Sequence, residues 1–227
     1  MNGDLRVVGD VGAAFASLAA GELRSPDASR PYRLGCSGGS SGTACFARLA
    51  QEPGIPWGAV ECFFADERCV GAASPDSNAA SIAAALGGVL DFLADYHPMS
   101  CAEGPAAYGT LLADAGGFDL LQLGLGPDGH TASLFPGADG RDAPPGALVI
   151  VNADPSGRNA FQRLSVTFAA IALARLIVVT VVGADKADAL RRIVAGEDLP
   201  GARIDGGRVV WLVDEAAAAG LDPKVGP

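Results

Sequence analysis

Phe118 to Gly137 reads FDLLQLGLGPDGHTASLFPG, and this stretch decides the fold class. An apolar run, Leu120 to Leu125, is followed by glycines that mark a tight loop, and the loop carries His130, one of only two histidines in the chain. Polar groups therefore gather where a buried strand ends. In an open α/β sheet, ligands bind in the crevice beyond the carboxyl ends of the strands. The stretch predicts a ligand site at this loop.

The glycines from 124 to 129 also spell G-x-G-x-x-G, the dinucleotide-binding pattern. That pattern requires a preceding strand, a helix that opens at the loop, and an acidic residue about twenty positions further on. Pro127 and Asp128 favour a turn instead, and no acidic residue closes a second strand at that distance. A nucleotide site is therefore disfavoured. His130 could simply be satisfied within a turn, but a histidine beside an aspartate suits general-base chemistry near neutral pH.

Composition limits the class of protein. The 227 residues are 49% hydrophobic with a mean hydropathy of +0.29, enough for one sizeable core, so we expect a single domain over residues 1–227. The net charge is −10 and the isoelectric point about 4.5. These values disfavour nucleic acid and anionic membranes as partners. We expect a monomer or a weak homo-oligomer.

The cysteines and the N-terminal segment bear on the compartment. The five cysteines are odd in number and contain no C-x-x-C pair, so neither a disulfide framework nor a zinc site is expected, and reduced, mostly buried thiols are the default. The first residues lack a basic segment followed by an apolar core. These features predict a cytoplasmic location.

Apolar segments of strand and helix length alternate along the chain. Residues 176–182 form a branched apolar run typical of a strand buried on both faces. The pattern predicts an α/β fold with a single doubly wound, mostly parallel sheet of Rossmann type and helices on both faces. Strands are expected at 5–8, 32–36, 60–65, 120–125, 147–151, 164–168, 176–182 and 209–213, and helices at 11–23, after 43, at 79–93, 106–112, 169–174, 186–195 and 216–219.

Three further strand ends carry polar groups. Ser37 to Thr43, rich in glycine and serine, suits anion binding by backbone N–H groups and a helix N-terminus, although a flexible connector is the alternative. Asp66-Glu67-Arg68 is either a surface turn or the acid and cation of a site. Lys186 could be a solvated residue of a first helical turn. Since parallel strands end at the same edge of a sheet, we expect these groups to lie near His130.

The assembled groups suit a small, anionic, oxygen-rich substrate. Amides, hydroxyls and a lysine can bind phosphate, a histidine can transfer a proton, and an arginine can stabilise developing negative charge. No G-x-S-x-G nucleophile elbow with evident triad partners is found. The chemistry expected is activation of water, without a covalent acyl step, a metal or a cofactor.

Gly124 to Pro136 closely resembles the signature of the 6-phosphogluconolactonases, members of the glucosamine-6-phosphate isomerase/6-phosphogluconolactonase superfamily. The resemblance implies hydrolysis of 6-phospho-D-glucono-1,5-lactone to 6-phosphogluconate in the oxidative pentose phosphate pathway. It extends over most of the chain through Ser37-Gly38-Gly39-Ser40, residues 63–68, Asp76-Ser77-Asn78, Arg163 with Thr167, and residues 183–187.

The resemblance also implies residue roles. His130 would be the general base, Arg68 would contact the substrate or steady charge near the carbonyl, and Asp66 and Asp128 would orient polar groups. The 6-phosphate would be held by Ser37, Gly38, Gly39, Ser40, Arg163 and Lys186.

The chain departs from the family pattern at one motif, and two other functions compete with the lactonase activity. Ser41-Gly42 stands where the family usually has Thr-Pro, which predicts a looser phosphate loop. Deamination of glucosamine 6-phosphate is the runner-up, but the carboxylate expected after the histidine loop is missing from Thr131 to Pro136. A non-catalytic sugar-phosphate sensor is a third possibility, disfavoured by the lack of a helix-turn-helix before Tyr32 and by the negative charge.

Overall fold

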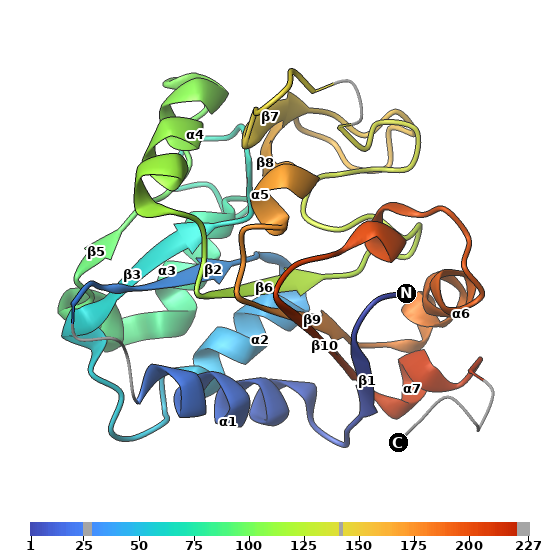
Figure 1. The fold of residues 1–227 in the computed structure, drawn as a ribbon, viewed down its shortest axis with the longest axis horizontal. Coiled ribbons are helices and arrows are strands. Elements are labelled where there is room, and N and C mark those ends of the chain that lie inside the picture. The colour runs from blue at the N-terminus through green and yellow to red at the C-terminus, as the bar shows by residue number, and fades with distance from the viewer. Residues whose placement is uncertain (25–28, 141–142, 222–227) are drawn as a thin grey trace.

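The computed structural model describes residues 1–24, 29–140 and 143–221. Seven parallel strands form the central sheet in the order β1-β10-β9-β6-β2-β3-β5 (Figure 1). The predicted doubly wound sheet is confirmed. Residues 137–145 are rich in Gly, Asp and Pro, which predicts a loop, and residues 141–142 of it lie outside the described residues. The strands are β1 (Asp4–Val7), β2 (Tyr32–Cys36), β3 (Val60–Phe64), β5 (Asp95–Tyr96), β6 (Leu120–Gly124), β9 (Leu176–Val181) and β10 (Arg208–Val213).

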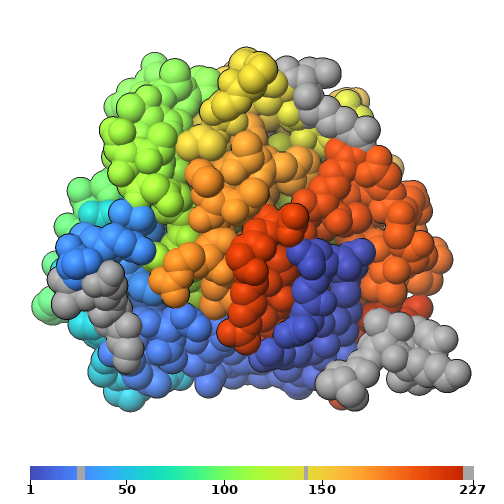
Figure 2. All heavy atoms as spheres, viewed as in Figure 1, coloured from blue at the N-terminus to red at the C-terminus, as the bar shows by residue number. Residues whose placement is uncertain are grey.

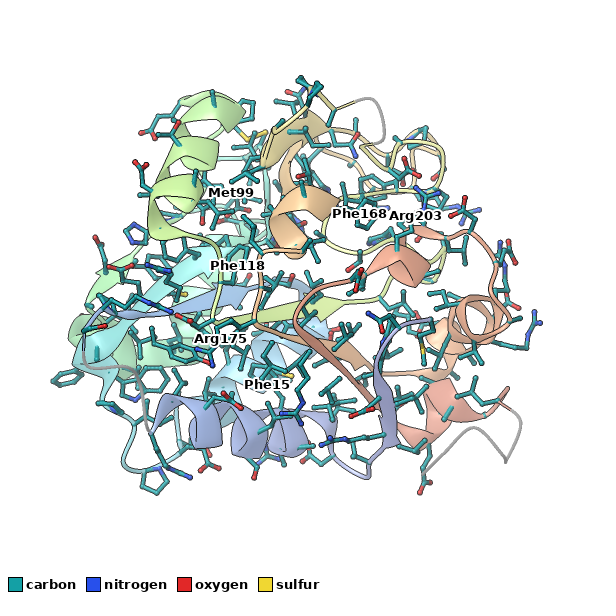
Figure 3. The ribbon with its side chains drawn as sticks, viewed as in Figure 1. Phe15, Met99, Phe118, Phe168, Arg175 and Arg203 are labelled. Carbon is teal, nitrogen blue, oxygen red and sulfur yellow. A yellow bond between two sulfur atoms is a disulfide. The ribbon has the colours of Figure 1, made fainter. Side chains whose placement is uncertain are left out.

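Helices cover both faces of the sheet, as expected. Phe15 and Phe118 lie on opposite faces (Figure 3). In the space-filling view, β1, in blue, lies beside the red-orange segment that contains β10 (Figure 2). One face carries α1 (Val11–Leu23), α2 (Gly39–Leu49) and α3 (Asn78–Leu86), the other α4 (Gly104–Ala115) and α5 (Phe168–Ile171), while α6 (Ala187–Val194) and α7 (Glu215–Ala218) follow β9 and β10 (Figure 1).

Burial follows the sequence pattern. All six residues of β9 are buried, as the branched apolar run predicted. Helix ends are set by local side chains: Asp10 accepts a hydrogen bond from Ala13 N at 2.9 Å at the start of α1, and Ser77 accepts one from Ala80 N at the start of α3. Such caps satisfy amide groups that a helix leaves without partners. The cores on the two faces therefore hold the strand ends in fixed positions.

A second sheet corrects one expectation. Asp66 to Arg68 is neither a surface turn nor a simple strand end, because it forms β4 (Asp66–Arg68) of an antiparallel sheet with β8 (Arg163–Val166) and β7 (Val149–Asn152). Ala65 connects the two sheets. Its N–H donates to Cys36 O in the central sheet at 2.8 Å, and its carbonyl accepts from Val166 N in the small sheet at 2.8 Å.

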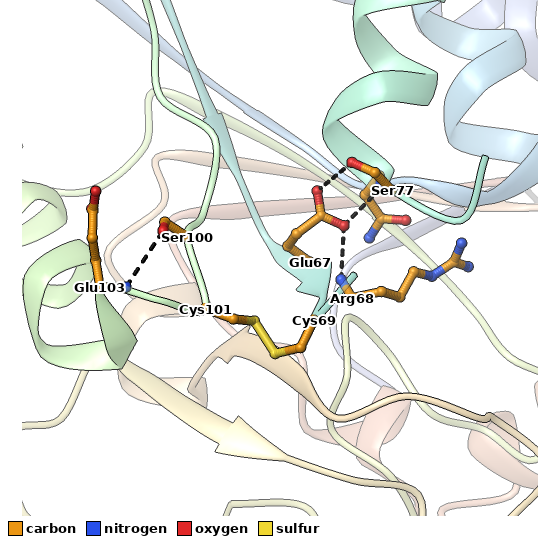
Figure 4. The surroundings of a disulfide bond; sticks show 8 residues. Glu67, Arg68, Cys69, Ser77, Ser100, Cys101 and Glu103 are labelled. Carbon is orange, nitrogen blue, oxygen red and sulfur yellow. Dashed lines mark hydrogen bonds between the residues drawn. A yellow bond between two sulfur atoms is a disulfide. The ribbon is translucent and has the colours of Figure 1, made fainter. Parts of the chain in front are cut away.

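The cysteines differ from the expectation that all of them are reduced thiols. Cys36, Cys45 and Cys62 are free and buried, as expected, but Cys69 and Cys101 form a disulfide (Figure 4). The bond joins the residue after β4 to the loop before α4. The partners are separated by 32 positions and meet only through the tertiary fold, so their spacing carried no signal.

Asp119, just before β6, has a buried carboxylate that pairs with partly exposed arginines, at the edge of the sheet opposite to the carboxyl ends of the strands. Its carboxylate accepts two hydrogen bonds from Arg30 at 2.6 Å each, one from Arg33 N at 2.9 Å and one from Arg175 at 3.2 Å; Arg175 is labelled in Figure 3. Burial raises the pKa of Asp119, but the hydrogen bonds and the arginine charges outweigh it and lower the pKa below its ordinary value.

Asp119→Asn is expected to lower the free energy of unfolding by about 2 kcal/mol at pH 7, because it leaves buried donors and a cation without a charged partner. A depressed carboxyl pKa stabilises the fold above the unfolded-state pKa of about 4, and this contribution is lost as pH falls through the folded-state pKa. Urea titrations at pH 7 and near pH 2.5 should therefore show a difference between the two proteins that shrinks in acid. A difference independent of pH would contradict this account.

Candidate functional site

A cavity of about 180 Å³ lies where β2, β3, β6 and β9 end. The four polar strand ends meet there, as predicted. Asp128 does not line the cavity, but it contacts a residue that does. The predicted residues that line it are Ser37, Gly38, Gly39, Ser40, Asp66, Arg68, His130, Arg163 and Lys186.

The histidine loop orients its imidazole through Asp128. Oδ1 of Asp128 lies 2.6 Å from Nδ1 of His130 and also accepts a hydrogen bond from the His130 backbone N–H at 3.1 Å. Because a carboxylate can only accept, Nδ1 must carry the proton, which leaves Nε2 as the basic nitrogen. The loop itself is closed by Gly126 N, which donates to His130 O at 2.8 Å. The geometry is that of a histidine prepared to take a proton.

The charge on Asp128 is retained. Burial raises the pKa of Asp128, yet the hydrogen bonds and attraction of His130 outweigh burial and bring the pKa below its ordinary value. An ionised Asp128 in turn favours the Nδ1-protonated form of His130.

Gly126 makes room for the imidazole, and its replacement should test this orientation. An alanine Cβ at position 126 would lie 2.1 Å from His130 Nδ1. Gly126→Ala is therefore expected to displace the ring. The kcat of a reaction in which His130 takes a proton should then fall by about 100-fold, the loss expected when a reacting group is misplaced by about 1 Å. Gly124→Ala is the matched control, because its Cβ would have no neighbour nearer than Ser41 Oγ at 3.8 Å. Equal activity of the two variants would contradict the orientation described here.

The glycine and serine segment forms the start of α2. The helix begins at Gly39, so the residues expected to form a loop up to Thr43 belong largely to its first turns. Gly38 is the N-cap residue, and it supplies no side-chain hydrogen bond. The first amide groups of a helix have no partners within it, and they attract anions. The N-terminus of α2 thus presents backbone donors to the cavity.

Gly42, which was expected to loosen this segment, is tightly packed within α2. It is buried within α2, where an added Cβ would lie 2.2 Å from Ser37 O. Only a glycine allows the helix to approach β2 this closely. The substitution of Gly for the family's Pro therefore accompanies tight packing.

Lys186 places a cation at the same end. It lies in the short helix Ala184–Lys186 before α6, and its Nζ lies 2.5 Å from Asp185 Oδ2. The Asp185 side chain is exposed, and ion pairs at such positions contribute little stability. The pairing with Asp185 thus holds Lys186 only weakly.

Two arginines face each other across the small sheet. Arg68 in β4 pairs with Arg163 in β8, and the Arg68 Nη1 donates to Asp76 O at 2.9 Å. Burial lowers the pKa of Arg163, while Asp66 opposes this effect. The Arg163 guanidinium also lies 5.7 Å from the ring centre of Phe135. Two like charges are thus held near each other beside the cavity.

Asp66 is held by residues that the sequence analysis did not single out for a role. One carboxylate oxygen accepts from Ser133 Oγ at 2.6 Å, and the other from Asn78 Nδ2 at 3.1 Å. Ser133 follows Ala132, which lines the cavity with a left-handed φ of 48°, uncommon for a residue other than glycine. Ser133 and Asn78 both lie inside motifs that resemble the family, but nothing in their spacing indicated a partner for Asp66.

Unpartnered polar atoms also gather here. Within the part of the chain that the structure describes, four buried side-chain polar atoms have no hydrogen-bond partner, and three of them belong to residues that line this cavity: Ser37 Oγ, Arg68 Nε and Arg163 Nε. Buried polar groups are nearly always paired in folded proteins. Their concentration at one place indicates a site built for a polar, negatively charged ligand.

A larger cavity, of about 860 Å³, lies between α4 and β7. None of the candidate residues lines it, and its walls are mostly alanine, glycine, proline and aliphatic side chains. Across the described ranges, no three His, Cys, Asp or Glu side chains are grouped to bind a metal, and no helix there is both long and apolar enough to cross a membrane.

Comparisons with known proteins identify the family of the chain. A family model described as glucosamine-6-phosphate isomerases/6-phosphogluconolactonase matches residues 9–211. The 6-phosphogluconolactonase of Synechocystis sp. is 34% identical over 209 residues, which cover 84% of this chain and 85% of that protein.

A longer protein and a solved structure are also similar to this chain, over different shares of their length. The GDH/6PGL endoplasmic bifunctional protein of Oryctolagus cuniculus is 35% identical over 214 residues that cover 83% of this chain, which spans only 26% of that longer protein. The solved structure of 6-phosphogluconolactonase from Trypanosoma brucei superposes with a TM-score of 0.81 at 27% identity, covering 97% of this chain and 99% of that one. The chain therefore belongs to the family of glucosamine-6-phosphate isomerases and 6-phosphogluconolactonases.

Proposed function

We propose that this protein is a 6-phosphogluconolactonase, which hydrolyses 6-phospho-D-glucono-1,5-lactone to 6-phosphogluconate in the oxidative pentose phosphate pathway. The observation that carries the proposal is one cavity in which an Asp128-oriented His130 lies with the N-terminus of α2 and the arginines of the small sheet. The family membership and the similarity to 6-phosphogluconolactonases over most of the chain support it.

The chemistry follows from these positions. His130 Nε2 removes a proton from water, and the resulting hydroxide attacks the lactone carbonyl carbon. Negative charge then develops on the carbonyl oxygen, where Arg68 can stabilise it. The ring C–O bond breaks, the leaving oxygen takes up the proton from the imidazolium, and the carboxylic acid so formed loses its own proton to the solvent and becomes a carboxylate. Asp128 stabilises the charged imidazole, and Asp66 positions the groups around it.

The phosphate fits the other end of the cavity. The amides at the start of α2 supply donors in fixed positions, and Lys186 and Arg163 supply positive charge. Such local charges are needed because the whole protein carries a net charge of −10. Binding of the phosphate would hold the lactone in place for attack.

Deamination of glucosamine 6-phosphate is less well supported. The described segment after the histidine, residues 131–136, contains no carboxylate. Its hydroxyls are also engaged, since Thr131 Oγ1 donates to Gly124 O at 3.0 Å and Ser133 Oγ donates to Asp66. No acid is therefore available there to assist opening of an amino-sugar ring.

Hydrolysis of freshly generated 6-phosphogluconolactone by the purified protein tests the proposal, with glucosamine 6-phosphate as a parallel substrate. Release of 6-phosphogluconate well above the spontaneous rate is expected, with no ammonia from the amino sugar. Ammonia release without lactone hydrolysis would assign the protein to the other activity of its family.

A further inference from the structure

Gln122 is an amide side chain placed in the middle of the apolar strand β6. The residue is fully buried, and both ends of its amide are hydrogen-bonded. Its Oε1 accepts from the backbone N–H of Ser37 at 3.0 Å, and its Nε2 donates to Thr180 Oγ1 at 2.9 Å. Gln122 therefore links the end of β2, where the anion-binding segment begins, to β9 on its other side.

The first turns of α2 pack directly on this link. A Cβ at Gly42 would lie 3.2 Å from Gln122 Oε1 and 2.2 Å from Ser37 O. The helix, Ser37 and the amide thus lie close together, with no space for a side chain at position 42.

Stability alone does not require an amide at this position. The neighbours of Gln122 in β6 are leucines, and Thr180 is the one hydroxyl residue among the branched and aliphatic residues of β9. A buried amide is costly unless it is fully paired, and a well-packed apolar residue is usually as stable. Two polar residues from neighbouring strands nevertheless meet directly beside the site.

The hydrogen bond from Ser37 N–H to Gln122 also determines which backbone N–H groups remain available to a ligand. The Ser37 N–H is used by Gln122, so it cannot bind a phosphate at the same time. The amides at positions 39–41 follow it at the start of α2, and all three residues line the cavity. Their direction is set by the conformation of Ser37 and Gly38.

We propose that Gln122 is a positioning residue that fixes Ser37, and through it the first turn of α2, so that the helix amides bind the 6-phosphate of the substrate. This proposal rests on the proposed function and adds a specificity role to it. Gln122 supports the preference for a phosphorylated lactone over an unphosphorylated one. Gln122 acts through Ser37 and touches no reacting atom.

Gln122→Met tests the proposal, because methionine keeps the length of the side chain and removes the acceptor for Ser37 N–H. The KM for 6-phosphogluconolactone is expected to rise about tenfold, the effect of losing one buried hydrogen bond of about 1.4 kcal/mol, with kcat changed less than about twofold. Inorganic phosphate should inhibit competitively with an affinity weakened by the same factor. The kcat/KM for unphosphorylated glucono-1,5-lactone should stay unchanged.

Thr180→Val is the matched variant, since it removes the partner of Gln122 Nε2 and leaves the bond to Ser37 in place. Its KM for the phosphorylated lactone should rise about two- to threefold, by a weaker version of the same effect. If Gln122→Met does not fold, judged by its thermal transition, this variant carries the test, and an unchanged KM overturns the proposal.

The outcomes separate the two proposals. Equal losses on both lactones, or no loss on either, would overturn the role of Gln122 while the lactonase activity stands. A wild-type protein without lactonase activity would instead remove the proposed function. The stabilisation of wild type and Gln122→Met by inorganic phosphate, measured by thermal shift, would then still show whether Gln122 positions an anion site.

Discussion

Replacing His130 with alanine is expected to lower kcat for lactone hydrolysis by about two to four orders of magnitude, the usual contribution of a general base. The expectation rests on the 2.6 Å contact between Nδ1 and Asp128, which leaves Nε2 free to accept a proton. The KM should change little, because we propose that the phosphate binds elsewhere in the cavity, at the start of α2. Steady-state kinetics with freshly generated lactone measure both constants.

His97→Ala is the control, since His97 is the other histidine and does not line the cavity. It should retain kcat. Asp128→Asn should lower kcat by about 10- to 100-fold, because an amide can donate to Nδ1 and thereby favour the wrong tautomer. Undiminished activity of His130→Ala would remove the histidine from the mechanism.

Loss of the Cys69–Cys101 disulfide is expected to lower the free energy of unfolding by about 3 kcal/mol. The bond closes a loop of 32 positions, and a cross-link over such a span restricts the unfolded chain substantially. Urea unfolding of Cys101→Ser without reductant should match that of the wild type with dithiothreitol. The control is that reductant has no effect on Cys101→Ser. A wild-type urea unfolding transition that is the same with and without dithiothreitol would contradict the stabilising role of the bond.

Much of the site was predictable because parallel strands end at one edge of a sheet. Ser37, His130 and Lys186 each followed an apolar run, so their meeting required only the strand pattern. The bounds of β2 and β9 were also close to those predicted, since long apolar runs between polar breaks identify buried strands well.

The rest depended on contacts between distant segments. The strand β4 is too short and too charged to show an apolar period, and it exists only because β8 pairs with it from almost a hundred positions away. The acid of Glu67 was expected at the surface or in the site, yet it accepts hydrogen bonds from Ser77 and from the first amides of α3. Gln122 lay inside an apolar run and was counted only as part of a strand.

Ala65 has a mechanical consequence for the way a substrate is held. The amides that we propose to bind the phosphate lie at the start of α2, directly after β2 of the central sheet. Arg68 and Arg163 belong to the small sheet, and Ala65 is bonded to both sheets. Rotating one sheet away from the other would break one of these two backbone bonds. The spacing between the start of α2 and these arginines therefore depends on how the two sheets join at Ala65, and that spacing limits the length of the molecule that enters.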